Sequence, residues 1–518
     1  MRCFLHRLFI ILLLLIFLYG TSWAEQSKYF DLGGSKSYVV LDRYHPFESQ
    51  VTRPNSVYVI RDGFILKQDI VIPKESVLLF EGGSIGGSSK ITFQNTELRG
   101  TYNAFNNTLL FAGTIKGNAD IFYFDIRLDD KTYDNGVVIN KVVGICKGIS
   151  IPAGNIYFTT PIVMSSMTRI ECEANLFYNG KASDISAITV KQSDGVFSFN
   201  GIIRNESHSA RYPVYTARNN SKTRGLEICS VNNSQISFKN ISYFNEGLRI
   251  SDTNHIGCSY NTFNLGIIIN ANYHIRVYQH NKDNSSSNTA LSWCNQNLFI
   301  GGRCTNYTHD WNYNESTPCY CFYFNGGNQE GYNDSQNSIN NITIIGTSLE
   351  IPNDANIYIN NGSNFSIINT RHENSKIALK LVGRSSNIHF TPGYGNHKVD
   401  LSENGHQGLV MTSECYHLKL SDNYTEIDVS KHKYIKLDSP VKGRYYIKYL
   451  EDTQGVITDN KRNRYPVILD TYFHPSEKAL ITSSDGYSRS FIVPDNIVKI
   501  GIRASNEKMK GGVIIIGD

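Results

Sequence analysis

Residues 341–390 read NITIIGTSLEIPNDANIYINNGSNFSIINTRHENSKIALKLVGRSSNIHF, and parts of this stretch recur every 23 residues. Asn341, Asn364 and Asn387 mark the repeat. The residues one and three places after each asparagine are always apolar, namely Ile342, Ile344, Phe365, Ile367, Ile388 and Phe390. Apolar residues at alternate positions are typical of a strand, and a strand recurring every ~20 to 50 residues is typical of a solenoid. Since no helical pattern separates the strands, we predict one coil of a parallel β-helix per repeat.

Upstream, the interval between similar phrases lengthens. Asn261, Asn297 and Asn341 each begin such a phrase, but they lie 36 and 44 residues apart. We therefore expect inserted loops at residues 281–292 and 305–338, which are rich in Tyr, Trp, His, Asn and Asp. Long loops on a rigid scaffold often carry function, so substrate is expected near them.

The first 24 residues have the features of a secretory signal peptide. Arg2 and Arg7 form a basic start, Leu8–Leu18 is an unbroken apolar run, and residues 22–24 offer the small residues of a cleavage site. The run is too short to span a membrane comfortably, and no later stretch approaches ~20 apolar residues. We predict an exported protein, periplasmic or secreted, with no membrane span after cleavage.

Three segments follow the signal. Residues 25–125 read as short strands and turns, which predicts an N-terminal β module or the first coils. Residues 126–400 are predicted to be the β-helix catalytic domain. It begins with the acidic pair Asp129-Asp130, expected to cap a short amphipathic helix whose apolar side is Val137, Val138, Ile139 and Val142. Residues 401–518 alternate apolar and polar residues, which predicts an antiparallel, sandwich-like β domain. The fold class is therefore all-β.

Composition says less about partners and cofactors. The formal charge of +4 is small for 518 residues, so an acidic substrate must meet a local basic patch, and nothing points to nucleic acid. The cysteines are scattered and lack the paired spacing of zinc sites, so we expect small buried side chains, with at most one disulfide. No metal or other cofactor is predicted. A calcium ion stays open as an alternative, although no D-x-D-x-D-G loop supports a site for it.

Several phrases resemble the pectate-lyase-like superfamily of right-handed parallel β-helix proteins, over roughly residues 55–395. The module at residues 57–87 is similar to the N-terminal part of polysaccharide-degrading β-helix proteins of gut Bacteroidetes. The coil phrases are CSYNTFNLGIII (258–269), WCNQNLFIGGRC (293–304) and NNITIIGTSLE (340–350). The resemblance implies a right-handed β-helix acting on polysaccharides. It does not choose among lyases, glycoside hydrolases, esterases and viral tail spikes.

One strand offers the chemistry of a polysaccharide lyase. If Ile275 and Val277 point inward, then His274, Arg276 and Tyr278 share the outer face, because side chains alternate along a strand. Elimination from a uronic acid needs a base, an acid, and a cation at the carboxylate. We assign His274 as the base and Tyr278 as the acid, with Arg276 and Arg303 neutralising the carboxylate; the alternative is a solvated polar face.

A second constellation fits a glycoside hydrolase. Glu350 and Glu373 lie one 23-residue period apart, so they are expected to stack on adjacent coils. Two carboxylates ~5 to 5.5 Å apart suit a retaining hydrolase. The alternative interpretation is a structural ladder.

Further residues are candidates for substrate binding, through stacking on sugar rings or contact with acidic groups; packing within the loops is the alternative. They are His309, Trp311, Tyr313, Tyr320, Tyr323, Arg371 and His372. Together these patterns favour a lyase that cleaves a uronic-acid-containing polymer, glycosaminoglycan or pectin-like. A glycoside hydrolase and a non-catalytic glycan-binding surface protein remain as alternatives.

Overall fold

The computed structural model describes most of residues 36–404 and short segments beyond them. The described residues are 36–206, 222–252, 256–279, 293–306, 318–326, 338–350, 354–373, 375–383, 385–395, 399–404, 415–417, 425–430, 434–438, 444–456, 467–470, 488–492, 497–504 and 513–517. The predicted signal peptide lies outside them. The chain divides into two compact units, residues 1–116 and 117–518.

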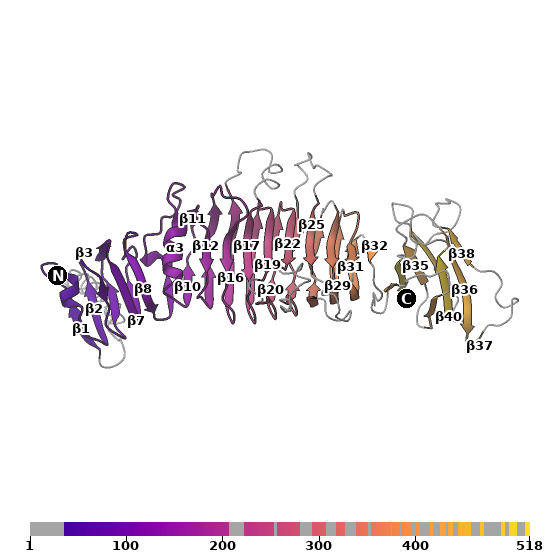
Figure 1. The fold of residues 1–518 in the computed structure, drawn as a ribbon, viewed down its shortest axis with the longest axis horizontal. Coiled ribbons are helices and arrows are strands. Elements are labelled where there is room, and N and C mark those ends of the chain that lie inside the picture. The colour runs from indigo at the N-terminus through magenta and orange to yellow at the C-terminus, as the bar shows by residue number, and fades with distance from the viewer. Residues whose placement is uncertain are drawn as a thin grey trace, which may run out of the picture. The chain divides into compact units, whose positions relative to one another are not determined.

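The first unit consists of short parallel strands in successive coils (Figure 1). Its elements are β1 (Ser37–Val40), α2 (Phe47–Gln50), β2 (Ser56–Ile60), β3 (Gly63–Leu66), β4 (Ile70–Val71), β5 (Val77–Phe80), β6 (Ser84–Gly87), β7 (Lys90–Gly100) and β8 (Leu110–Ile115). Val57 and Val59 of β2 pack on Val77 and Leu79 of β5 in the interior. The predicted N-terminal β module is thereby confirmed.

The second unit contains two large sheets of parallel strands, which confirms the parallel β-helix. The fifteen-stranded sheet comprises β9 (Asn118–Asp120), β10 (Gly148–Ile151), β11 (Asn155–Phe158), β13 (Arg169–Cys172), β14 (Asn175–Tyr178), β16 (Val196–Asn205), β18 (Gln235–Ser242), β20 (Thr262–Asn264), β21 (Ile267–Ile269), β23 (Leu298–Ile300), β24 (Arg303–Thr305), β26 (Ile339–Ile345), β27 (Ser348–Glu350), β29 (Gly362–Glu373) and β31 (Ser386–Gly395).

The nine-stranded sheet carries its strands in chain order, one coil after another (Figure 1). They are β12 (Ile162–Met164), β15 (Ser186–Val190), β17 (Arg224–Cys229), β19 (Glu246–Ser251), β22 (Tyr273–Tyr278), β25 (Tyr320–Asn325), β28 (Ala355–Asn360), β30 (Leu379–Gly383) and β32 (Val399–Asn404). A short 3-10 helix, Ile121–Tyr123, precedes these coils.

The 23-residue repeat is a register of stacked strands. Ile344 pairs with Ile367 and Ile367 with Phe390, as the spacing predicts. Asn341 and Asn364 have φ angles of +52° and +57°. Asparagine recurs there because it tolerates this left-handed conformation better than other side chains except glycine.

One prediction about the inserted region is wrong. The interval between stacked residues does lengthen there, since Phe263 pairs with Phe299, 36 residues on, and Phe299 pairs with Ile344, 45 residues on. The predicted insertion at residues 305–338, however, contains a regular strand, β25. Its alternating Phe322 and Phe324 are buried, so this part continues the coil instead of forming a loop.

Helix α3 (Asn135–Val143) confirms the short helix expected after residue 129, and it contacts β11 and β12. Its N-cap is Asp134, whose Oδ1 accepts a hydrogen bond from the Gly136 amide at 3.1 Å. The acidic pair does not cap it, since Asp130 instead accepts hydrogen bonds from Thr132. Val138, Ile139 and Val142 are buried as predicted, whereas Val137 is exposed.

Beyond residue 404, the described strands pair antiparallel in two sheets, as predicted. The first contains β33 (Cys415–His417), β35 (Tyr434–Asp438), β39 (Ser488–Ile492) and β41 (Val513–Gly517). The second contains β34 (Thr425–Asp428), β36 (Arg444–Asp452), β37 (Gly455–Val456), β38 (Val467–Asp470) and β40 (Ile497–Ala504).

The cysteines behave as small core side chains. Within the described residues, eight cysteines form no disulfide and have buried side chains, namely Cys146, Cys172, Cys229, Cys258, Cys294, Cys304, Cys319 and Cys321. In the part of the chain that the structure describes, no helix is long and apolar enough to cross a membrane.

Candidate functional site

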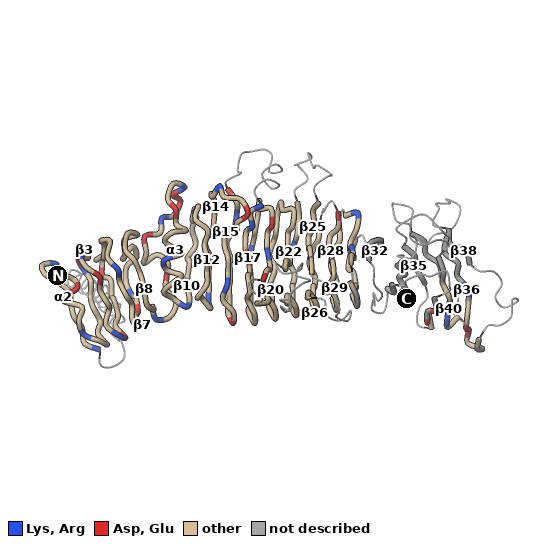
Figure 2. Tube along the Cα trace, in the orientation of Figure 1, with Lys and Arg blue, Asp and Glu red and all other residues tan. Residues whose placement is uncertain are grey.

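The outer face of the nine-stranded sheet carries a polar groove of about 710 Å³ over β17, β19 and β22. Its lining includes four cationic side chains, Lys222, Arg224, Arg249 and Arg276, and two acidic ones, Asp184 and Glu246. Tyr273 and Tyr278 also line it. Figure 2 shows acidic and basic positions close together around β15 and β17. The lining therefore carries two more cationic than acidic side chains.

The strands here share a bend that places residues three apart on the same outer face. In β19, Glu246 and Arg249 bond to each other, while Gly247 and Leu248 lie between them. The strand pairing skips Gly247, and it skips the equivalent residue on each neighbouring strand. These equivalent residues run from Ala187 in β15 to Asn356 in β28. Two successive side chains thus point inward before alternation resumes.

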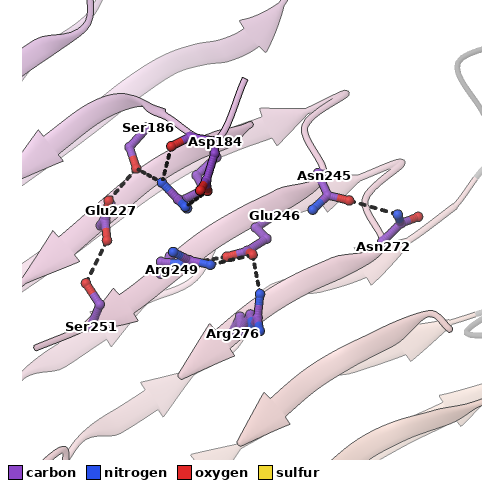
Figure 3. A network of polar contacts seen from close by, with 10 residues as sticks. Asp184, Ser186, Glu227, Asn245, Glu246, Arg249, Ser251, Asn272 and Arg276 are labelled. Carbon is purple, nitrogen blue, oxygen red and sulfur yellow. Dashed lines mark hydrogen bonds and ion pairs between the residues drawn. The ribbon is translucent and has the colours of Figure 1, made fainter. Parts of the chain in front are cut away.

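Glu246 is the centre of an ion-pair network (Figure 3). Arg249 donates to its carboxylate through Nε at 2.6 Å and through Nη2 at 2.7 Å. Arg276, on the neighbouring strand, donates through Nη1 at 2.5 Å. The Glu246 residue is only 2% exposed, so this carboxylate is desolvated and paired with both guanidinium groups.

A second network lies beside the first (Figure 3). Glu227 accepts hydrogen bonds from the Ser186 hydroxyl and, at 2.7 Å, from the Ser251 hydroxyl. Arg224 pairs with Asp184 and also donates to the Asp184 carbonyl at 3.2 Å. Each charged group in this network has a polar partner.

Tyr278 lies against both arginines of the Glu246 network. The Arg249 and Arg276 guanidinium carbons are 5.1 and 4.9 Å from the centroid of its ring. Arg276 also lies 4.8 Å from the ring centroid of Tyr273. Guanidinium groups at such distances interact favourably with aromatic rings. The predicted pair of Arg276 and Tyr278 is therefore brought together.

Tyr320 and Tyr323 belong to β25 rather than to a loop. Their ring centroids lie 5.0 Å apart, and Tyr323 stacks on Tyr358 at 4.7 Å. Burial raises the pKa of Tyr323 to about 12. Burial and the hydrogen bond to Asp354 raise the pKa of Tyr320 well above its usual value. Both phenols therefore stay protonated near neutral pH, as members of an aromatic ladder beside the groove.

His274 does not lie on the outer face, which corrects the prediction. Its side chain is fully buried, with Nδ1 3.0 Å from the Tyr320 carbonyl oxygen and Nε2 3.2 Å from that of Thr305. The strand bend is the reason, because His274 occupies the inward position that Gly247 holds on β19. A side chain so enclosed cannot reach a substrate.

Arg303 and the two predicted carboxylates lie on the fifteen-stranded sheet, away from the strands of the groove. Glu350 and Glu373 pair in register on adjacent strands, so the predicted stacking is confirmed. However, Glu350 accepts from Arg303 at 2.5 and 3.0 Å, whereas Glu373 pairs with Arg371. Although burial opposes it, hydrogen bonding to Arg303 and Ser348 lowers the pKa of Glu350.

His372 is also buried, so the prediction that it binds substrate is wrong. Its Nδ1 accepts a hydrogen bond from the Asn356 amide at 2.9 Å, and its Nε2 lies 2.8 Å from the Thr370 hydroxyl. It follows Arg371 on β29 and therefore points to the opposite face, into the core. Three other candidates, His309, Trp311 and Tyr313, lie outside the described residues.

The sequence analysis missed four charged residues of the two networks, although the sequence contained a signal for them. They are Arg224, Glu227, Glu246 and Arg249. Residues 224–228 read RGLEI and residues 246–250 read EGLRI, which is the same phrase with its charges exchanged. In the structure Arg224 pairs in register with Glu246, and Glu227 with Arg249. Opposite charges therefore face each other across the two strands.

In the part of the chain that the structure describes, no group of three or more His, Cys, Asp and Glu side chains is placed to hold a metal ion. The residues of the groove are instead suited to hydrogen bonding, charge neutralisation and proton transfer.

No family model matches the chain, and no curated protein does. Solved structures that resemble it include the tailspike protein gp49 of Acinetobacter baumannii bacteriophage Fri1, a capsular polysaccharide depolymerase. That structure is 10% identical and has a TM-score of 0.29, with 77% of this chain and 86% of gp49 covered. The enzymatically active domain of bacteriophage CBA120 tailspike protein 2 is 10% identical, with a TM-score of 0.21 and coverage of 94% of this chain and 76% of that domain. Structural similarity this weak does not allow the activity of these tailspike proteins to be assigned to this chain. The resemblance to the pectate-lyase-like superfamily stays a prediction.

Proposed function

We propose that this protein binds an acidic polysaccharide in the groove of the nine-stranded sheet and cleaves it by β-elimination. One observation carries the proposal: the guanidinium groups of Arg249 and Arg276 flank the ring of Tyr278 inside a groove whose lining has more cations than acids. A carboxylate-bearing sugar, two cations and a proton-transfer group are what this reaction requires.

The groove is suited to an extended polymer. Its strands are one coil apart, and adjacent strands lie ~4.8 Å from each other, a step comparable to the length of one sugar ring. A chain lying across the strands would therefore place successive sugars over β17, β19 and β22. The export predicted from residues 1–24 would bring the protein to such polymers outside the cytoplasm.

Both arginines keep donors for the ligand. Arg249 bonds to Glu246 through Nε and Nη2, which leaves Nη1. Arg276 bonds to the same carboxylate through Nη1, which leaves Nη2, whereas its Nε is buried and out of reach of a ligand. These groups can neutralise a uronate carboxylate and stabilise the charge that develops on it.

Tyr278 takes the role first assigned to His274. In the proposed reaction, Tyr278 acts in its phenolate form, beside the Arg249 and Arg276 guanidinium groups, and the phenolate oxygen removes the proton from the carbon next to the carboxylate. The electron pair of that C–H bond forms the new carbon–carbon double bond, and the bond to the leaving sugar oxygen breaks. Tyr278 then returns the proton to that oxygen, so protons and charge balance without a cofactor.

The experiment supplies a panel of uronic polysaccharides and records ultraviolet absorbance, because elimination creates an unsaturated uronide. We expect absorbance with at least one polymer, and we expect Tyr278→Phe to lower kcat by ~100-fold or more, the scale of general acid–base catalysis. Tyr394→Phe is the matched control. Tyr394 also lies beside an arginine, 5.7 Å from Arg371, but on the fifteen-stranded sheet. Its rate should stay at the wild-type value.

Other outcomes would replace the proposal. New reducing ends without absorbance would favour a glycoside hydrolase, for which Glu350 and Glu373 stack in register. Retained binding with neither signal would favour a glycan-binding protein. An undiminished rate in Tyr278→Phe would remove Tyr278 from the reaction.

A further inference from the structure

We infer that Glu246 is a positioning and specificity residue, which sets the orientation of Arg249 and Arg276 and makes the groove prefer an unsulfated uronic-acid chain to a sulfated one. The inference rests on the proposed binding of an acidic polysaccharide. It concerns which acidic polymer is bound, and it assigns a role to a carboxylate that the elimination step does not use.

The first step of the argument is the geometry of the two cations. Arg249 and Arg276 occupy paired positions on adjacent strands, so their side chains start one strand spacing apart. Two positive charges that close repel each other and would turn apart. The Glu246 carboxylate lies between them and accepts three hydrogen bonds at 2.5 to 2.7 Å. It therefore holds both guanidinium groups in one arrangement.

The second step is burial. The side chains of Glu246 and Arg249 are 3% and 8% exposed, and that of Arg276 is 20% exposed. Ion pairs so shielded from water keep their geometry better than exposed ones and are screened less by salt. The free donors of both arginines are thus fixed before a ligand arrives, which lowers the entropic cost of binding.

The third step is charge. Two arginines and one glutamate carry a net charge of +1, which matches a single uronate carboxylate. A sulfate ester added to the same sugar would bring a second negative charge close to Glu246. Of the two groove cations outside this network, Arg224 is paired with Asp184 and Lys222 precedes β17. Repulsion of that kind disfavours the wrong ligand as effectively as attraction favours the right one. Glu246 therefore selects against dense charge.

The test measures dissociation constants by calorimetry for two probes, an unsulfated chondroitin hexasaccharide and its sulfated form. We expect the wild-type protein to bind the unsulfated probe more tightly. In Glu246→Gln, which keeps the side-chain shape but removes the charge, the unsulfated probe should bind ~10-fold more weakly and the sulfated probe should not lose affinity. The ratio of the two constants therefore changes, which a general loss of structure would not produce.

Two further variants separate charge from position and from stability. Glu97→Gln removes another arginine-paired carboxylate, on β7 of the first unit, and should leave both dissociation constants unchanged. Glu246→Asp keeps the charge on a shorter side chain, so both probes should weaken while their ratio stays the same. If Glu246→Gln fails to fold, a changed ratio of the two dissociation constants in Glu246→Asp, which keeps the charge, would overturn the inference.

The failures are distinguishable. If the wild-type protein binds neither probe, the proposed function and this inference both fall. If it binds them but Glu246→Gln leaves both constants unchanged, or weakens both equally, the inference alone is overturned.

Discussion

His274 shows how one residue can have the right chemistry and the wrong direction. Imidazole is a common general base, and strict alternation would have placed it beside Arg276 and Tyr278 on the surface. The bend in the strand turns it inward, where both ring nitrogens lie near backbone carbonyls. Its role is therefore structural, since a ring N–H donates to a buried carbonyl of the neighbouring coil.

This role predicts a loss of stability instead of a loss of chemistry. His274→Ala should destabilise the protein by ~2 to 5 kcal/mol, because it leaves a cavity and removes the hydrogen bond that the ring donates to a buried carbonyl. The midpoint of urea unfolding, followed by circular dichroism, measures the effect. A fully stable variant with a large fall in kcat would contradict the structural role and restore the catalytic assignment.

At the scale of the element, a strand of this β-helix is specified by a few positions. Residues 224–228 and 246–250 share the pattern of two outward charges around an inward glycine and leucine. Larger inward residues at the glycine position, such as His274 and Cys321, are fully buried too. One outward column carries arginine on β19 and β22 and tyrosine on β25 and β28, so the change of side chain along this column divides the groove from the aromatic ladder.

The asparagines that open the repeats give a prediction at this scale. Asn341 has a φ of +52°, which an alanine adopts at a cost of ~1 to 2 kcal/mol. Asn341→Ala should therefore lower the midpoint of urea unfolding, whereas Asn341→Gly should keep it near the wild-type value. An equal loss in both variants would instead show that the hydrogen bond from Asn341 to the Asn340 side chain carries the effect.

At the scale of the whole molecule, the β-helix buries its cysteine thiols in the core enclosed by its coils. Burial raises the pKa of Cys146, Cys172 and Cys258 to about 12, and that of Cys294 and Cys321 well above the usual value. At pH ~8 these thiols stay protonated, and it is the thiolate that reacts.

These five cysteines should therefore resist a thiol-specific reagent in the native protein and react after unfolding. Peptide mapping of the labelled sites is the measurement, since it separates them from cysteines outside this set. Labelling of Cys258 in the folded protein, at a rate close to that of a free thiol, would contradict the burial.

The repeat at residues 341–390 by itself determined the fold class and the register of three coils, because a recurring pair of apolar residues can be buried in only one way in a stacked coil. The sequence also placed Arg276 and Tyr278 on a common face. It did not locate the groove, because the strands that form it are separated by unequal intervals of 22 and 27 residues.

Only the tertiary structure decided which candidates meet. It turned His274 and His372 inward, paired Glu350 and Glu373 with separate arginines, and brought Glu246 between Arg249 and Arg276. The physical reason is that a side chain's direction depends on local bends in the strand, and its partners depend on which coils stack. Alternation along the chain contains neither piece of information.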